Sequence, residues 1–302
     1  MLEDIGTLIS KGFGTWTKNL NICVPFIFDM MAAIVFFIFS LFVFTVIFIV
    51  PLVSQQNIDP ESISPEEMLS MFSNVFSENM WLLILVGIII YLLYMLVQSF
   101  FAAGAIGMAR SASQKGNTDL RDMFHAGREN YLNLFLIKLL VSLLVLSGMV
   151  FLVPGIISIG DIDIFLTNPD SGFVGTTILT VGMLVWVLYL IILSLVFFLV
   201  EYALVIDGLD PIGAIEQGIS VFRKNMFPAF LIWFWVIILT VALTLIGEII
   251  SYVDIVAQIW PFLQLVLSII VIQPLIAVWL TRFYLNRTEK KLYSFEDYML
   301  DY

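Results

Sequence analysis

Two charged side chains, Asp29 and Lys138, stand inside long apolar stretches of the sequence. If each stretch is a membrane-spanning helix, both charges lie about 10–13 Å inside the membrane, at about 1.5 Å of rise per residue. A lone charge at that depth costs about 2.5–3.5 kcal/mol or more. Three interpretations stay open. Lys138 extends to the near interface, Asp29 and Lys138 form a structural ion pair, or they form an intramembrane polar site.

Three further charges, Arg110, Glu201 and Arg282, mark the cytoplasmic ends of apolar stretches. They could form a ring that clasps these ends together, or each could be an ordinary interface residue. The segment 160–163, Gly-Asp-Ile-Asp, resembles the Gly-Asp element of intramembrane aspartyl proteases. It falls between two stretches, however, and no second Asp lies at a matching depth. Two carboxylates are also too few for a hard-cation cage.

Residue types that most catalytic centres need are scarce in this chain. The single cysteine, Cys23, cannot form an internal disulfide, and the single histidine, His125, cannot form a His-based metal cluster. The sequence contains no Ser/His/Asp set, Walker loop, HExxH motif or Cys pair. We therefore predict a non-enzymatic protein with no cofactor and no metal site.

The charged residues must be positioned by apolar helices that are long enough to cross a bilayer, which takes roughly 20 residues. Six stretches qualify: 22–53, 80–109, 132–158, 173–201, 227–252 and 260–284. With 61% hydrophobic residues, 12% charged residues and a mean hydropathy of +1.05, the composition is far from that of a soluble domain. The remaining segments are too short for a separate soluble catalytic domain.

Basic residues are distributed on one side of this six-span topology. All 13 Lys and Arg residues belong to that side, whereas the opposite loops carry acidic residues. The positive-inside rule then predicts a multi-pass plasma-membrane protein with both termini in the cytoplasm. Its expected partners are the lipid bilayer and, as further options, other membrane subunits or a second copy of the chain. The short basic run at 287–291 is insufficient for binding nucleic acid.

A pattern recurs three times along the chain: an apolar stripe at helical spacing, then an Asn, then a span. Asn19, Asn130 and Asn225 end the three stripes, and each is expected at a turn between a cytoplasmic helix and a span. The predicted fold is an all-α integral membrane domain, 1–302, of three parallel repeats. Each repeat is an interfacial amphipathic helix plus a two-helix hairpin. The repeats cover approximately residues 1–110, 111–207 and 208–302. The amphipathic helices either lie in the headgroup layer, pack under the bundle as its floor, or act as a moving gate.

Three local features complete the prediction. Ser64-Pro65-Glu66-Glu67 is typical of a helix start and indicates a short helix along the outer surface. The small residues in 102–109 favour close contact between helices. Pro274 is the best candidate for a kink inside a span.

Two segments are typical of a known family. They are 213–225, which ends in Arg-Lys-Asn before a span, and 281–287, an aromatic and basic tail after the last span. With the repeat, these segments resemble the glycerophosphoryl diester phosphodiesterase membrane-domain family, in its stand-alone archaeal and bacterial members. The resemblance implies a poorly characterised integral membrane protein. The catalytic barrel is absent, so the resemblance transfers neither the phosphodiesterase activity nor any site residues.

Two functional hypotheses follow. The first is a scaffold, accessory or membrane-homeostasis protein, which the shortage of catalytic groups favours. The alternative is a small transporter or channel with pseudo-threefold repeats and a polar site on the cytoplasmic side. Mitochondrial carriers also have three parallel units, but 51–54 and 154–157 lack their Pro-x-acid-x-x-basic motif. A membrane enzyme acting on lipid has least support. A cavity lined by Asp29 and Lys138 would favour transport, and a solid apolar core would favour the scaffold.

Overall fold

The structure is a computed structural model that describes residues 3–50, 65–159, 173–250 and 254–293. Side chains of 48–49, 65–79 and 254–257 are not described. Within these ranges every element is helical, and six helical segments are long and apolar enough to cross a membrane. The all-helical fold with six potential membrane spans is therefore confirmed. The segment 160–163 lies outside the described residues.

Most of the spans consist of two or three consecutive helical segments. The elements are α1 (Ile5–Lys18), η1 (Leu20–Cys23), α2 (Val24–Phe44), η2 (Thr45–Ile49), α4 (Pro65–Lys115), α5 (Leu120–Ser147), η4 (Gly148–Leu152), α6 (Val153–Ile159), α8 (Phe173–Phe197), α9 (Val200–Asp207), α10 (Pro211–Lys224), α11 (Met226–Ile250), α12 (Asp254–Leu267), η6 (Ser268–Ile272) and α13 (Gln273–Arg287).

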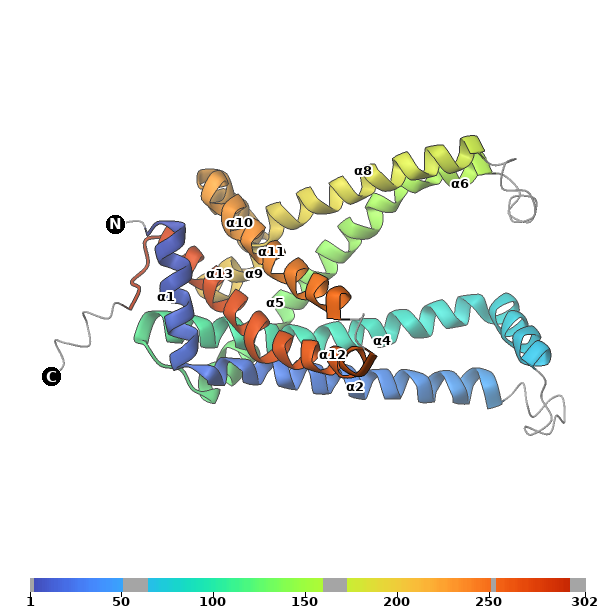
Figure 1. The fold of residues 1–302 in the computed structure, drawn as a ribbon, viewed down its shortest axis with the longest axis horizontal. Helices are drawn as coiled ribbons and strands as arrows, with labels where there is room; N and C mark the ends of the chain where they lie inside the picture. Colours follow the sequence, from blue (N-terminus) through green and yellow to red (C-terminus); the bar gives the residue numbers. More distant parts are fainter. Residues whose placement is uncertain (1–2, 51–64, 160–172, 251–253, 294–302) are drawn as a thin grey trace.

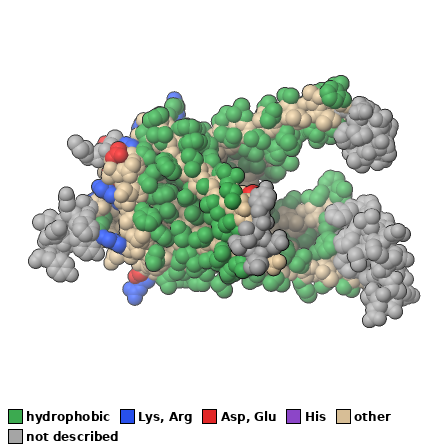
Figure 2. Space-filling model, viewed as in Figure 1, with side chains coloured by type: hydrophobic (Ala, Val, Ile, Leu, Met, Phe, Trp, Pro, Cys, Tyr) green, Lys and Arg blue, Asp and Glu red, His purple; other side chains and the backbone are tan. Residues whose placement is uncertain are grey.

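The helices diverge from one end of the molecule. In Figure 1, α1, α10 and the C-terminal part of α13 lie at that end, and two arms extend away from it. One arm is α2 with α4, the other is α6 with α8, and α11 and α12 lie between them in this view. Figure 2 shows Lys and Arg side chains at the α1 end and hydrophobic side chains along the rest of the molecule. This separation is what a protein that crosses a membrane requires.

Local sequence explains where the helices of the α1 end begin. Asp4 caps α1, because its carboxylate accepts hydrogen bonds from the Thr7 backbone N–H and the Thr7 hydroxyl. Asp119 and Asp122 form a reciprocal capping box at the start of α5. Pro211 occupies the first turn of α10, where its missing N–H removes no hydrogen bond.

The buried core is concentrated at the α1 end. Helix α13 is its centre, since nearly every residue from Pro274 to Asn286 is buried. Leu8 and Trp16 of α1 pack into the same core, and the Trp279 indole N–H donates to the Ile9 carbonyl at 3.1 Å. Most side chains in the outer parts of the arms are exposed, as expected where lipid replaces protein contacts.

Small residues bring pairs of spans into close contact, as predicted for 102–109. A Cβ on Gly104 would lie 2.6 Å from Met123 Cγ, and one on Gly107 would lie 2.2 Å from Ala126 Cβ. Helices α4 and α5 therefore touch at a distance that larger side chains would prevent.

Two sequence-based boundaries are wrong. A helix does begin at Pro65, as predicted, but it does not end before the span: it is the first part of α4, which bends and continues into the span in Figure 1. Helix α5 passes through Asn130 without the expected turn. Prolines explain the difference, because Pro25 and Pro228 lie in the first turns of the helices after Asn19 and Asn225. No proline lies near Asn130, so the helix continues.

The last span departs from α-helical geometry where the kink was predicted. Pro274 has no backbone N–H to donate, and the π-helical turn η6 ends immediately before it. Within this turn the Gln273 N–H donates to the Ser268 carbonyl, five residues back.

Candidate functional site

A cavity of about 530 Å³ lies among α4, α5, α8, α9, α11 and α13. Its polar lining residues are Tyr91, Tyr94, Gln98, Lys138, Ser142, Ser194 and Glu201, and its apolar lining residues are Met95, Ile137, Val141, Phe197, Phe198, Trp233, Val236 and Leu280. The cavity is thus an apolar chamber with a few convergent polar groups, which is the general character of small-molecule sites.

Lys138 lines this cavity from α5. Its Nζ atom donates a hydrogen bond to Gln98 Oε1 on α4 at 3.2 Å, and the neighbouring Ile137 is buried. The ammonium group is therefore directed toward α4, and its contact is inside the protein. This contact is not the ion pair with Asp29 that was one of the three interpretations, and the intramembrane polar site stays a prediction.

Glu201 enters the same cavity because the fourth span is interrupted. Helix α8 ends at Phe197 and α9 begins at Val200, so Glu201 occupies the first turn of a new helix. The residues around it in α9 are buried, and the helical segment continues to Asp207. The predicted end of this span at residue 201 is therefore too early. In the described part of the chain Glu201 and Lys138 form no direct ion pair, so two opposite charges face one cavity.

Asp29 does not line this cavity. It lies on α2, and its Oδ1 atom is buried with no hydrogen-bond partner among the described residues. Its charge acts on Lys138 and Tyr94, although no direct Asp29–Lys138 ion pair is formed. The two residues predicted as a pair are thus electrostatic neighbours, and the second charge of the cavity is Glu201.

Arg110, Glu201 and Arg282 do not form a ring. Arg110 Nε donates to Gln114 Oε1 at 3.3 Å on its own helix. Arg282 is 2% exposed and binds the Glu3 carboxylate through two nitrogens, with Nε–Oε2 at 3.1 Å and Nη2–Oε1 at 2.9 Å. This bidentate pair joins α13 to the N-terminal segment.

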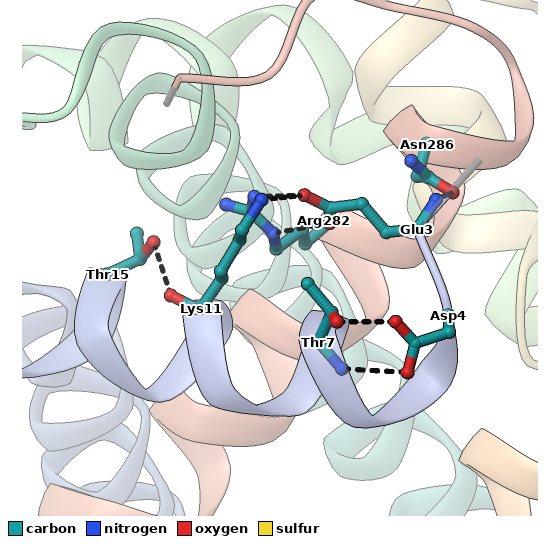
Figure 3. Close-up of polar contacts among 7 residues, drawn as sticks. All are labelled: Glu3, Asp4, Thr7, Lys11, Thr15, Arg282 and Asn286. Carbon is teal, nitrogen blue, oxygen red and sulfur yellow. Dashed lines mark hydrogen bonds and ion pairs between the residues drawn. The ribbon is translucent and has the colours of Figure 1, made fainter. Parts of the chain in front are cut away.

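Glu3 is the centre of a cluster at the α1 end, shown in Figure 3. Lys11 Nζ lies 2.8 Å from Glu3 Oε1, and the Glu3 backbone N–H donates to Asn286 Oδ1 at 3.2 Å. Burial by itself would raise the pKa of Glu3, but the hydrogen bonds and charges of Arg282 and Lys11 outweigh it, so the pKa is lowered. Sequence reasoning missed this cluster because Glu3 precedes every predicted element.

Lys138 and Glu201 were both singled out from the sequence, but their grouping was missed. They lie on α5 and α9, two elements separated along the chain by α6 and α8. The only available signal was that each is a charge next to an apolar stretch. Which charges lie close together depends on how spans that are not adjacent in sequence pack. The spacing of apolar residues in the sequence does not reveal that packing.

These features define the class of the molecule: an all-helical membrane-type protein with six potential spans and a partly open cavity among them. Within this class, the chain belongs to the family of the domain of unknown function DUF7847, whose model matches residues 9–285. No curated protein and no solved structure matches the chain. The resemblance to the glycerophosphoryl diester phosphodiesterase membrane-domain family stays a prediction.

Proposed function

We propose that this protein is a non-enzymatic membrane protein whose cavity binds a polar or amphiphilic ligand, as a small transporter does. The observation that carries the proposal is the presence of Lys138 and Glu201 in one cavity of about 530 Å³. Ionisable groups inside spans are costly and usually serve a ligand or ion path. The volume also falls within the roughly 300–1,000 Å³ typical of ligand sites.

The cavity distinguishes this proposal from a passive scaffold. A scaffold requires only that the spans pack, and the Gly-mediated contact of α4 with α5 already does this without charges. Lys138 and Glu201 are not used to neutralise each other. This supports a role for both charges toward a molecule inside the cavity, with Lys138 held by its hydrogen bond to Gln98.

The proposal includes an orientation in the membrane. The basic α1 end faces the cytoplasm of a plasma-membrane protein under the positive-inside rule. To test this, Asn117→Cys and Asp170→Cys are introduced separately into a Cys23→Ser protein in intact cells. Residue 170 lies outside the described residues. Asp170→Cys should react with an impermeant thiol reagent from outside, and Asn117→Cys only after permeabilisation. The reverse pattern would contradict the orientation.

We also propose that the chain contains three related units. The support is one shared contact: each Asn side chain donates to the carbonyl four residues earlier, at 2.9 Å for Asn19, 2.9 Å for Asn130 and 3.0 Å for Asn225. Asn19 and Asn225 also share their backbone conformation, with φ −128° and −131°. The second unit differs because its helix runs on through Asn130.

Cysteine accessibility tests whether the cavity is open to polar molecules. In a Cys23→Ser background, Ser194→Cys places a thiol in the cavity, and Ile192→Cys places one on an exposed, lipid-facing part of the same helix. A charged methanethiosulfonate reagent is applied to the protein in nanodiscs, where both membrane faces are accessible. Ser194→Cys should react and Ile192→Cys should not. Equal lack of reaction at both positions would contradict a ligand-accessible cavity.

The scaffold remains the second candidate, and the arm formed by α6 and α8 favours it. This arm extends away from the core, and exposed residues such as Val174 and Leu184 line it. A second membrane subunit could cover this surface. Native mass spectrometry of the nanodisc-extracted protein would then find a stable dimer or hetero-complex, whereas a monomer would exclude this role for the arm.

A further inference from the structure

An apolar groove shares lining residues with the cavity of Lys138 and Glu201. It lies between α2 and α4, has a volume of about 600 Å³, and is lined by residues such as Phe36, Phe44 and Ile90. Tyr91 and Tyr94 line both the groove and the cavity, so the two spaces lie on either side of these residues. A mostly apolar cavity that holds a few charged and polar side chains, next to an apolar groove, matches the two parts of an amphiphile.

We infer that the cavity and the groove together bind one zwitterionic, lipid-like amphiphile. Its headgroup lies between Lys138 and Glu201, and its acyl chain lies in the groove between α2 and α4. This inference rests on the proposed function, because it requires that the cavity accept a ligand.

The charges of the cavity select the headgroup. Lys138 provides a cation and Gln98 provides amide N–H donors, which suits a phosphate group. Glu201 provides an anion and Trp233 an aromatic ring in the same cavity, and both attract an ammonium group. Because the cavity has a positive side chain, Lys138, and a negative one, Glu201, that do not pair with each other, a zwitterionic headgroup fits better than a purely anionic one.

Tyr91 and Tyr94, which line both spaces, suit the boundary between a polar headgroup and an apolar acyl chain. The Tyr91 hydroxyl lies 3.1 Å from Ser142 Oγ, and the Tyr94 ring lies edge-on to Phe36, with 5.7 Å between centroids. Tyrosine rings of this kind have an apolar body and a polar tip, as found where lipid headgroups meet acyl chains.

Gly87 offers a way to fill the groove without disturbing the fold. It lines the groove, and a Cβ built on it meets nothing within 4 Å. Gly87→Phe therefore extends a ring into open space, and Ser40→Phe does so from the opposite wall on α2. Ile88→Phe is the matched control, because its side chain is exposed on α4 outside the groove.

The experiment measures lipid binding to the full chain by native mass spectrometry in a non-ionic detergent. The probes are phosphatidylethanolamine, which is zwitterionic, phosphatidylglycerol, which is anionic, and glycerophosphoethanolamine, which is the zwitterionic headgroup without chains. Wild type should bind one phosphatidylethanolamine in preference to phosphatidylglycerol. Gly87→Phe and Ser40→Phe should each weaken that binding about tenfold, which corresponds to about two displaced methylene groups. Ile88→Phe should leave it unchanged, and Glu201→Gln should abolish the preference between the two lipids.

Two results would overturn the inference. Unchanged binding in both Gly87→Phe and Ser40→Phe would show that the groove holds no chain. Equal binding of both lipids by wild type would show that Glu201 does not recognise an ammonium group.

The failure of the inference is distinguishable from that of the proposed function. If glycerophosphoethanolamine binds as tightly as the lipid, the acyl-chain assignment is wrong while the ligand cavity stands. If Ser194→Cys is as unreactive as Ile192→Cys and no probe binds, the proposed function itself is wrong.

Discussion

Replacing Glu3 by Gln should destabilise the protein far more than its position near the N-terminus suggests. Glu3 is the partner of Arg282, whose side chain is 2% exposed in the centre of the core. Glu3→Gln removes the anion but keeps nearly the same shape. The guanidinium of Arg282 is then left buried without a counter-charge.

The size of the effect can be worked out from burial. Breaking a buried ion pair by removing one partner costs about 3–5 kcal/mol, because the remaining charge stays desolvated. Lys11, the other basic partner of Glu3, is 48% exposed, so its pair is worth at most about 1 kcal/mol. We therefore expect a loss of about 3 kcal/mol for Glu3→Gln and under about 1 kcal/mol for Lys11→Met.

The free energy of unfolding is measured by SDS titration in detergent micelles, at neutral pH and at low pH. In the folded protein the pKa of Glu3 lies below its ordinary value of 4.5, so the folded state favours the carboxylate. The stabilisation by Glu3 is therefore fully present above pH 4.5 and is lost as the pH falls through the folded pKa. The difference between wild type and Glu3→Gln should shrink accordingly below pH 4.5.

Equal, small losses for Glu3→Gln and Lys11→Met at neutral pH would refute this reasoning. They would mean that water reaches Arg282 once Glu3 is neutral. A double-mutant cycle with Arg282→Met separates these possibilities. If Glu3 and Arg282 form a pair, the loss in the double mutant differs from the sum of the two single losses by a coupling energy.

Three other single variants and one double variant test the packing and the charges of the helices. A Cβ on Gly155 would lie 2.4 Å from the Leu179 backbone, so Gly155→Ala should lower the free energy of unfolding by about 1–3 kcal/mol. Gly14→Ala, whose Cβ meets nothing within 4 Å, should raise it by up to about 1 kcal/mol. Lys138→Met should destabilise by about 1–3 kcal/mol, and adding Asp29→Asn should recover part of the loss. Strictly additive effects in the same SDS titration would show that these two charges do not interact.

Sequence reasoning predicted the helical class and the number of potential spans because the bilayer imposes both. A span must hold its hydrogen bonds internally and present apolar side chains, so helix type and number follow from hydropathy. Close contact of this part of α4 with another helix was also predictable, because Gly104 and Gly107 have no side chain that would keep the helices apart. That the partner is α5 was not. The helix boundary at Asn130 was missed, since an Asn ends a helix only where the next residues favour a new start.

The site was predictable only in part, for a reason that Glu201 illustrates. Hydropathy places a charge at the end of a span, but it does not show that the helix stops at Phe197 and restarts at Val200. That interruption turns Glu201 from an interface residue into a wall of the cavity. The pairing of Arg282 with Glu3 was hidden for a related reason, because the two residues are at opposite ends of the chain.

The same geometry indicates which part of the cavity wall can move. Helix α13 contributes Leu280 to the cavity, and two residues later Arg282 is held by Glu3 within the buried core. Movement of α13 would break that pair and uncover most of its buried side chains. The α8–α9 wall is different, because the chain is already interrupted at Phe198 and Leu199 and α8 is mostly exposed beyond it. We therefore expect the α8 wall of the cavity to move more readily than α13, which the Arg282–Glu3 pair holds in the buried core.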